Sequence, residues 1–283
     1  MAEPVTWTSA DAAAYLHAPT AGDDKYSRGV VGVQTGSDSY PGAAVLGVEA
    51  AWRTGIGMVR YLGAARDLVM ARRPETVTAE GRVQAWLMGS GMDAAARPAA
   101  LTDDLRLVLA GALPAVVDAG ALDLAVGAAA PVVVTPHARE HDVLRAALGL
   151  EPAGAGRVAA AHETAAALGG AVLLKGAETI VTAPSGWTAR VDAGTPWLAT
   201  AGTGDVLGGV LGAVVAAAQA RAEAERGTLD VEALGPLAAT AAWLHGRAGA
   251  IAARRAGGGA PGPITALDVA LALPEAVAAA SRT

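Results

Sequence analysis

Short runs of apolar residues alternate with longer Ala-rich segments over most of the chain. The runs predict strands at residues 30–33, 58–62, 86–88, 115–117, 132–135 and 172–174. The segments between them have helical character and include residues 42–53, 93–108 and 137–148. Alternation of strand and helix is typical of βαβ units and a parallel sheet. Because the strands contain few polar residues, we expect helices to cover both faces of the sheet.

The pattern changes after residue 174. Residues 178–182 and 187–191 have strand character and flank Ala183-Pro184-Ser185-Gly186, which predicts a β-hairpin. The last third of the chain is predicted to be helical over residues 205–225, 234–255 and 266–281, with a Gly- and Pro-rich loop over 257–263. No interdomain linker and no repeat of fixed period interrupts this order, so we expect residues 1–283 to form a single α/β domain.

Charge and composition narrow the class of protein. The net charge is −6, and Lys and Arg do not cluster with aromatic residues, so we expect no nucleic-acid partner. Cysteine is absent, which excludes disulfides and thiolate metal sites and fits a reducing compartment. The N-terminus lacks the basic start and apolar run of a signal peptide. The most apolar stretch, residues 206–218, is shorter than the about 20 residues of a membrane span, so we expect a cytoplasmic protein and no membrane partner.

The segment with the most chemical information joins a glycine-rich turn to a helix. Gly202, Thr203 and Gly204 form the turn, and Asp205 follows directly. Unpaired backbone N–H groups at the positive end of a helix bind phosphate oxygens, so the turn is a candidate anion hole. Asp205 is either an acid in the first helical turn, which stabilises the helix by about 0.3–1 kcal/mol, or a general base that faces a substrate hydroxyl. The turn is not a Walker A loop, because no Gly-Lys-Ser/Thr follows it.

Polar or glycine-rich residues also follow four of the predicted strands. They are Gly36 to Ala44, Gly89-Ser90-Gly91, Pro136-His137 with Glu140, and Lys175-Gly176. Open α/β sheets bind ligands at the carboxyl ends of their strands, so we expect these loops to form one crescent-shaped site. Taken singly, each loop also has an ordinary structural explanation as a turn, a helix start or a solvated charge at a strand end.

Taken together, these segments resemble the ADP-dependent NAD(P)H-hydrate dehydratase family, a branch of the ribokinase-like fold. The resemblance extends from about residue 25 to residue 249. It is carried by Gly36…Tyr40-Pro41-Gly42-Ala43-Ala44, Arg53-Thr54-Gly55-Ile56-Gly57, Val117-Asp118-Ala119, Thr135-Pro136-His137…Glu140, Leu174-Lys175-Gly176…Thr179, Leu198 to Leu207, and His245-Gly246. The Gly-x-Gly-Asp element alone is common to the wider kinase superfamily, whereas the combination in this order is specific.

The resemblance implies a ribokinase-like three-layer sandwich, whose mostly parallel central sheet is covered by helices on both faces. It also implies an enzyme of nicotinamide-cofactor repair. Such enzymes resemble kinases that transfer a phosphoryl group from ADP to the hydroxyl of the S form of hydrated NADH or NADPH. Phosphate then leaves, which restores NAD(P)H and produces AMP. Mg²⁺ accompanies the nucleotide, and no residue of the chain is assigned as a metal ligand.

The resemblance also assigns residues to roles. Asp205 is the general base, and the amides of Gly202, Thr203 and Gly204 hold the transferring phosphoryl group. The nucleotide site comprises Lys175, Gly176, Ala177, Glu178, Thr179 and Gly204, and the hydrate site comprises Ala44, Gly91, His137 and Asp205. The family's frequent tetramers imply a homo-oligomer. Many relatives are fused to, or work beside, an NAD(P)H-hydrate epimerase, so we expect such an enzyme as a functional partner; this chain has no room for the second domain.

Two departures from the family pattern bear on the hydrate site. The family usually has Asp-Ala-Asp where this chain has Asp118-Ala119-Gly120, so no role is assigned to position 120. The usual Gly-Pro-Gly-Leu-Gly loop is Gly89-Ser90-Gly91-Met92-Asp93 here, which weakens the assignment of Gly91. Neither departure changes Asp205 or Lys175.

Two other functions remain open at this point. A small-molecule kinase of the same fold would use ATP to phosphorylate a vitamin precursor and would share Asp205 and the anion hole. The residues 135–137 and 36–44 match the dehydratases better. A nucleotide sensor without catalytic activity is the second alternative, and an intact Asp205 argues against it because binding alone requires no base.

Overall fold

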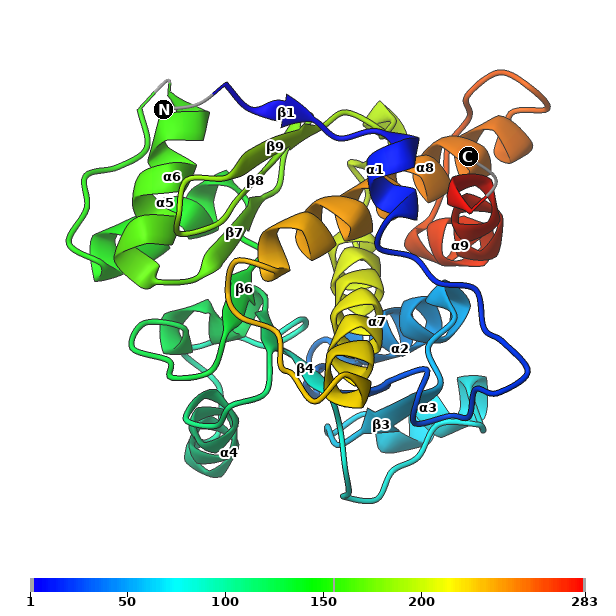
Figure 1. The fold of residues 1–283 in the computed structure, drawn as a ribbon, viewed down its shortest axis with the longest axis horizontal. Helices are drawn as coiled ribbons and strands as arrows, with labels where there is room; N and C mark the ends of the chain where they lie inside the picture. The colour runs from blue at the N-terminus through cyan, green and yellow to red at the C-terminus, as the bar shows by residue number, and fades with distance from the viewer. Residues whose placement is uncertain (1–2, 155, 282–283) are drawn as a thin grey trace.

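The computed structural model describes residues 3–154 and 156–281, and a single twisted sheet runs through its centre (Figure 1). The sheet has nine strands in the order β1-β9-β8-β7-β6-β5-β4-β2-β3. The strands are β1 (Val5–Thr6), β2 (Val30–Gln34), β3 (Met58–Tyr61), β4 (Ala85–Met88), β5 (Ala115–Val117), β6 (Val132–Val134), β7 (Ala171–Leu174), β8 (Thr179–Thr182) and β9 (Thr188–Val191).

Most of the strand pairs are parallel, as the alternation of strands and helices predicts. The pairs from β3 through β2, β4, β5 and β6 to β7 are parallel, and so is the pair of β1 with β9. The predicted hairpin is confirmed, because β8 pairs antiparallel with both β7 and β9. Every predicted strand is present, with ends shifted by no more than one residue.

Helices cover both faces of the sheet and make a three-layer structure (Figure 1). The helices are α1 (Ser9–Ala13), α2 (Pro41–Thr54), α3 (Arg66–Arg72), α4 (Ala99–Leu109), α5 (Ala138–Ala147), α6 (Arg157–Leu168), α7 (Thr203–Ala224), α8 (Leu234–Ala256) and α9 (Ala266–Ala280), with short 3₁₀ helices η1 (Ala119–Leu124) and η2 (Pro196–Leu198). One layer contains α2, α7, α8 and α9, and the other contains α4, α5 and α6.

Side chains of the central strands alternate between two hydrophobic cores. Val116, Val133 and Leu173 pack into the core beneath α7 and α8. Their neighbours Val117, Val134 and Leu174 point the other way, into the core beneath α4, α5 and α6. Because successive residues of a strand face opposite sides of the sheet, strands without polar residues are buried on both faces.

The predicted helix over residues 93–108 is wrong at its start. The helix α4 begins only at Ala99, after Pro98, whose fixed φ of −57° suits a helix start. The preceding residues form a turn in which the Asp93 side chain accepts a hydrogen bond from the Ala95 backbone. A turn closed by an Asp side chain competes with helix formation, and the apolar pattern alone did not reveal it.

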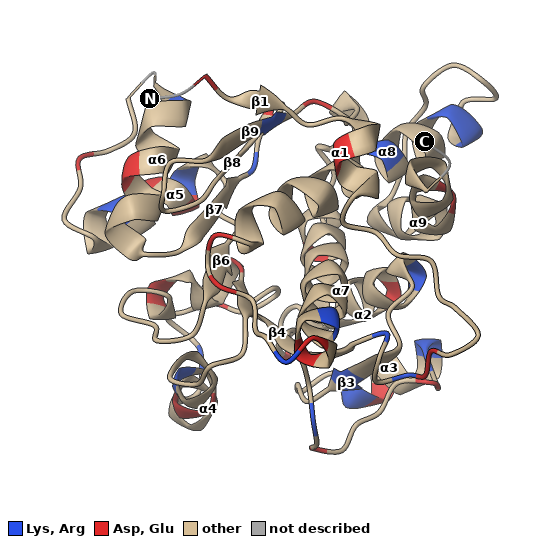
Figure 2. Cartoon of the chain, in the orientation of Figure 1, with Lys and Arg blue, Asp and Glu red and all other residues tan. Residues whose placement is uncertain are grey.

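The helix α7 lies at the centre of its layer (Figure 1). It has 22 residues and is long and apolar enough to cross a membrane by length and composition, yet 83% of its most apolar window is buried inside the protein. Charged residues are scarce on α7 and α8 and commoner on the outer segments (Figure 2). We therefore interpret α7 as a core helix.

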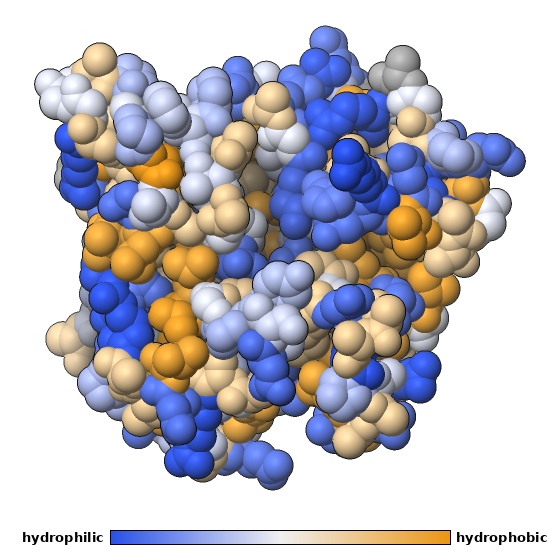
Figure 3. Space-filling model, turned by 180° about the vertical axis from the view of Figure 1, so that it is seen from behind, coloured by the Kyte–Doolittle hydropathy of each residue, from blue (hydrophilic) through white to orange (hydrophobic). Residues whose placement is uncertain are grey.

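On the face opposite to that of Figure 1, apolar groups form patches among hydrophilic ones (Figure 3).

Candidate active site

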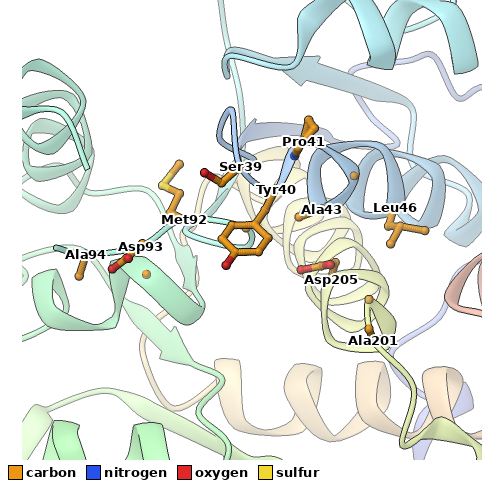
Figure 4. A pocket seen from close by; sticks show the side chains of 14 residues that line it. Ser39, Tyr40, Pro41, Ala43, Leu46, Met92, Asp93, Ala94, Ala201 and Asp205 are labelled. Atoms are coloured by element: carbon orange, nitrogen blue, oxygen red, sulfur yellow. The ribbon is translucent and has the colours of Figure 1, made fainter. Parts of the chain in front are cut away.

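The loops at the carboxyl edge of the sheet surround a cleft of about 760 Å³ (Figure 4). Residues from three predicted loops line it: Tyr40 to Ala43, Gly91 to Ala94, and Gly202 with Asp205. The crescent expected from the sequence therefore exists for the loops after β2 and β4 and for the start of α7. Gly120, from the loop after β5, also lines the cleft.

The start of α7 forms the glycine-rich end of the cleft. Gly202 precedes the helix with a φ of +86°, a left-handed conformation that glycine adopts without strain. The single hydrogen of the Thr203 hydroxyl is shared between the backbone oxygens of Leu198 and Thr200, at 2.8 and 2.9 Å. These bonds fix the turn, so the first N–H groups of the helix are held in place as a candidate anion site.

Asp205 lies in the first turn of α7, and its side chain points into the cleft (Figure 4). Burial raises the pKa of this carboxyl to about 6, and the nearby charge of Asp118 adds to the rise, while Lys175 opposes it. Within the described part of the chain, no protein group donates a hydrogen bond to the Asp205 carboxylate. A carboxylate with a raised pKa and no internal donor has the properties of a general base.

Asp118 is the second carboxylate of the site and plays a different part. It follows β5, is only 3% exposed, and accepts hydrogen bonds from Thr135 (2.6 Å), Ser90 (2.8 Å) and Lys175 (2.9 Å). Burial alone would raise the pKa of Asp118, but Lys175 and these hydrogen bonds hold it below its usual value. Asp118 is therefore ionised and bound by three donors, whereas Asp205 is free to accept a proton.

Lys175, at the end of β7, reaches toward the start of α7. Its ammonium nitrogen lies 3.8 Å from the position that a Cβ atom on Gly204 would occupy. Burial would lower the pKa of Lys175, but Asp118 and Glu140 raise it above its ordinary value, so the side chain carries a positive charge. A fixed cation beside helical N–H groups suits the binding of phosphate oxygens.

The other residues predicted for the nucleotide lie in the turn between β7 and β8. Gly176, Ala177 and Glu178 form this turn, and Thr179 begins β8. Arg157 donates hydrogen bonds to the backbone oxygens of Lys175 (3.2 Å) and Glu178 (3.0 Å) from α6. These two hydrogen bonds from Arg157 therefore hold the turn against α6. The role of this turn in nucleotide binding stays a prediction.

The residues predicted for the hydrate are only partly brought together. Gly91 and Asp205 line the cleft, and Ala43 does so in place of Ala44, which is fully buried. His137 caps the start of α5, where its Nδ1 accepts a hydrogen bond from the Glu140 backbone at 3.2 Å. The His137 side chain is 53% exposed and lines a separate, adjoining groove.

His245 received no role from the sequence, although it lies directly behind the glycine turn. Burial lowers the pKa of His245 to about 4, and a hydrogen bond to the Thr203 backbone offsets part of that shift. Its Nε2 atom is buried without a hydrogen-bond partner among the described residues. The imidazole is therefore neutral at physiological pH and supports the turn from α8.

Within residues 3–154 and 156–281, no group of three His, Asp or Glu side chains is placed to hold a metal ion. An ion used here would have to bring most of its ligands with it, as Mg²⁺ does when phosphates and waters coordinate it.

Comparisons with known proteins identify the family of this chain. A family model described as NAD(P)H-hydrate dehydratase matches residues 31–265. The bifunctional NAD(P)H-hydrate repair enzyme Nnr of Mycobacterium leprae is 44% identical over 213 residues, which are 71% of this chain and 44% of that protein. The ADP-dependent (S)-NAD(P)H-hydrate dehydratase of Xanthomonas campestris is 32% identical over 220 residues, 68% of this chain and 73% of that protein.

Solved structures show the same fold. The ADP/ATP-dependent NAD(P)H-hydrate dehydratase of Bacillus subtilis, co-crystallised with ATP and Mg²⁺, superposes with a TM-score of 0.78 at 24% identity, over 96% of this chain and 97% of that chain. A ribokinase-like superfamily protein of Enterococcus faecalis gives a TM-score of 0.79 at 22% identity, over 99% and 97% of the two chains.

Fold and site together define an α/β protein of the ribokinase-like class, with an acid at the glycine-rich start of a core helix. The chain belongs to the NAD(P)H-hydrate dehydratase family, and the resemblance inferred from its motifs is confirmed. The chain spans less than half the length of the bifunctional relatives from Mycobacterium.

Proposed function

We propose that this protein dehydrates the S form of hydrated NADH or NADPH, with ADP as the phosphoryl donor and AMP and phosphate as the other products. The observation that carries the proposal is the placement of Asp205. Its carboxylate has a pKa of about 6, faces the cleft, and lies in the first turn of the helix whose N–H groups form the candidate anion hole. The names of the relatives from Mycobacterium leprae and Xanthomonas campestris support the substrate and the donor.

In the first step, the carboxylate of Asp205 accepts the proton of the hydroxyl on the hydrated ring. The hydroxyl oxygen forms a bond to the β-phosphorus of ADP, while the bond from that phosphorus to the bridging oxygen breaks and AMP leaves. In the second step, the carbon–oxygen bond of the new phosphate ester breaks and the neighbouring ring carbon loses a proton. The ring double bond returns, and phosphate carries away the oxygen of the hydrate.

The chain's own groups stabilise the charge of the transferring phosphoryl group. The N–H groups of Gly202 and Gly204 would donate to its oxygens, while that of Thr203 also has a long hydrogen bond, at 3.4 Å, to the Thr200 backbone oxygen. The Lys175 ammonium lies beside Gly204. In phosphoryl transfer, positioning and electrostatic stabilisation supply most of the rate enhancement. Asp118 keeps Lys175 charged and oriented through their 2.9 Å ion pair.

We propose Mg²⁺ as the metal ion that accompanies the nucleotide phosphates. The described residues offer no cage of three ligands, which suits an ion held mainly by nucleotide phosphates and water. Glu140, which also accepts the His137 backbone N–H and lies 3.8 Å from Lys175, would offer a carboxylate oxygen to such an ion on this edge of the sheet. The ion would neutralise phosphate charge; the co-crystal of the Bacillus subtilis relative with ATP and Mg²⁺ supports its presence.

The kinase alternative differs in the fate of the phosphoryl group. A vitamin-precursor kinase would use ATP and release a stable phosphate ester, without restoring a ring double bond. The name of the Bacillus subtilis relative includes both ADP and ATP, so the choice of nucleotide alone does not separate the two functions. Formation of NADH or NADPH distinguishes the dehydratase from the kinase, because only the dehydratase restores the ring double bond.

The proposal extends to the cellular context. The bifunctional relatives support an NAD(P)H-hydrate epimerase as the functional partner, because only one form of the hydrate is the substrate. We also propose a cytoplasmic homo-oligomer, in line with the absence of cysteine and the apolar surface patches (Figure 3).

Purified protein, supplied with Mg²⁺, freshly prepared hydrate and either ADP or ATP, provides the test. Recovery of the dihydronicotinamide absorbance with ADP, accompanied by AMP, is the expected result. No recovery with either nucleotide rejects the dehydratase, and consumption of ATP with a stable phosphorylated product supports the kinase instead.

A further inference from the structure

A second cavity adjoins the catalytic cleft. It has a volume of about 320 Å³ and lies between η1 and the start of α5. Ala94 lines both cavities, and the consecutive residues Ala119 and Gly120 line the groove and the cleft, respectively. The two cavities therefore adjoin at the turn that follows β4. We call the second one the α5 groove.

The α5 groove has an apolar lining. Leu122 and Leu144 are buried, with 6% and 2% exposure, and Ala119 and Ala147 also line it. Val143 forms part of its edge and is 72% exposed, which is unusual for a large aliphatic side chain. An apolar groove of this size suits an aromatic ring such as a purine.

Arg139 is the unpaired charge of the α5 groove. The other charged groups are engaged: Asp123 forms an ion pair with Arg97 at 2.7 Å, and Glu140 accepts the His137 backbone N–H at 2.8 Å. Arg139 is exposed and forms no ion pair with any described residue. An arginine without a partner beside an apolar groove suits a ligand that carries phosphate next to a ring.

We propose that the α5 groove binds the adenosine half of the dinucleotide, with Arg139 contacting one of its phosphates. This inference rests on the proposed function, which places the hydrated ring at Asp205. A dinucleotide has a second nucleotide beyond its pyrophosphate, and that half must leave the cleft. The α5 groove adjoins the cleft, is large enough for a purine nucleoside, and carries the complementary charge.

Binding titrations test this proposal without turnover. The fluorescence of NADPH, NADH and reduced nicotinamide mononucleotide is followed with the wild-type protein and with Arg139→Ala, Val143→Asp and Arg254→Ala. Arg254 is an exposed arginine near the end of α8 and provides the matched control. ADP affinity is measured for the same four proteins.

We expect Arg139→Ala and Val143→Asp each to weaken NADPH binding about tenfold, as loss of one charge-assisted contact or of an apolar platform does. The mononucleotide, ADP and the Arg254→Ala variant should show no change. An equal loss for NADH assigns Arg139 to the pyrophosphate, whereas a smaller loss assigns it to the 2′-phosphate.

Three results overturn the proposal: unchanged NADPH binding in both groove variants, an equal loss for the mononucleotide, or a loss that affects ADP instead. The last result would assign the α5 groove to the phosphoryl donor. Failure of the proposed function has a different signature, because the titrations would then show the predicted pattern while the hydrate is not restored.

Discussion

The ammonium nitrogen of Lys175 lies 2.9 Å from a carboxylate oxygen of Asp118, at the centre of the candidate site. The pair joins the ends of β7 and β5, and Ser90 and Thr135 donate the remaining hydrogen bonds to Asp118. These three donors hold the pKa of Asp118 below its usual value, so Asp118 is a poor acceptor for a substrate proton. This arrangement leaves Asp205 as the carboxylate that can act as the base, with Lys175 held charged beside it.

We expect Asp118→Asn to destabilise the protein by about 3 kcal/mol, because the substitution leaves a largely buried ammonium without its closer counter-charge. Urea unfolding measures this change, and Asp104→Asn, at an exposed position of α4, is the matched control. The same variant should lower the pKa of Asp205, because Asp118 helps to raise it and Lys175 lowers it. A stability equal to that of the Asp104→Asn variant would show that the ion pair contributes nothing.

Replacement of the proposed base should separate binding from chemistry. Asp205→Asn keeps the shape of the side chain and removes its ability to accept a proton, so we expect kcat to fall by a factor of about 10²–10⁴. Nucleotide affinity, measured by calorimetry with ADP and Mg²⁺, should remain. Near-normal turnover in this variant would remove Asp205 from the mechanism.

The pH dependence of the reaction should report the Asp205 carboxyl. Burial and the Asp118 charge raise its pKa to about 6, and only the ionised form accepts a proton. We expect kcat/KM to rise with pH and to level off above about pH 6. A rate that is constant from pH 5 to pH 8 would be inconsistent with a base of this pKa.

Asp205 should also reduce the stability of the folded protein. Its pKa is about 6 when folded, against 3.8 for an ordinary Asp, so between these values the folded state binds more protons than the unfolded state. Stability therefore falls as the pH rises through this window and stays lower above it. We expect Asp205→Asn to raise the free energy of unfolding by about 1–3 kcal/mol at pH 8 and to have little effect at pH 4. Urea unfolding at the two pH values checks this; equal effects at both would contradict it.

Gly120 is required by the close approach of the loop after β4. A Cβ atom at this position would lie 2.3 Å from the backbone oxygen of Met92. We expect Gly120→Ala to cost about 1–3 kcal/mol, because one loop must move. Gly154→Ala is the control, since a Cβ there meets nothing within 4 Å. Equal melting temperatures for the two variants would show that the contact relaxes without cost.

This contact also explains how two departures from the family pattern belong together. Gly120 stands where the family usually has Asp, and Met92 and Asp93 belong to the second altered loop. In the fold these residues line the same cleft, and Gly120 makes room for the Met92 backbone. A single sequence shows each departure separately, because the two positions are 28 residues apart.

Local sequence was sufficient for the start of α7. A glycine turn followed at once by an apolar stripe predicts both the helix and its candidate anion site, because each depends on neighbouring residues. The buried strands were predictable for the same reason. The strand β1 was not predicted, since two residues without a periodic pattern gain their structure only by pairing with β9, far along the chain.

The hydrogen bonds around Asp118 could not be predicted from neighbouring residues in the sequence. Its donors come from positions 90, 135 and 175, and only the parallel order of β4, β5, β6 and β7 brings them together. The family resemblance marked the segment that contains Asp118 but gave it no role. Burial of Ala44 and the exposed position of His137 likewise depend on packing that the motifs do not encode.

The central claim is that the hydroxyl oxygen of the hydrate attacks the phosphoryl group held at the start of α7. The most direct measurement follows that oxygen. Hydrate labelled with a heavy oxygen isotope in the ring hydroxyl is converted with ADP and Mg²⁺, and the released phosphate is examined by mass spectrometry. We predict that the label appears in inorganic phosphate, one atom for each AMP formed. Label released as water, with unlabelled phosphate, would contradict phosphoryl transfer to the substrate.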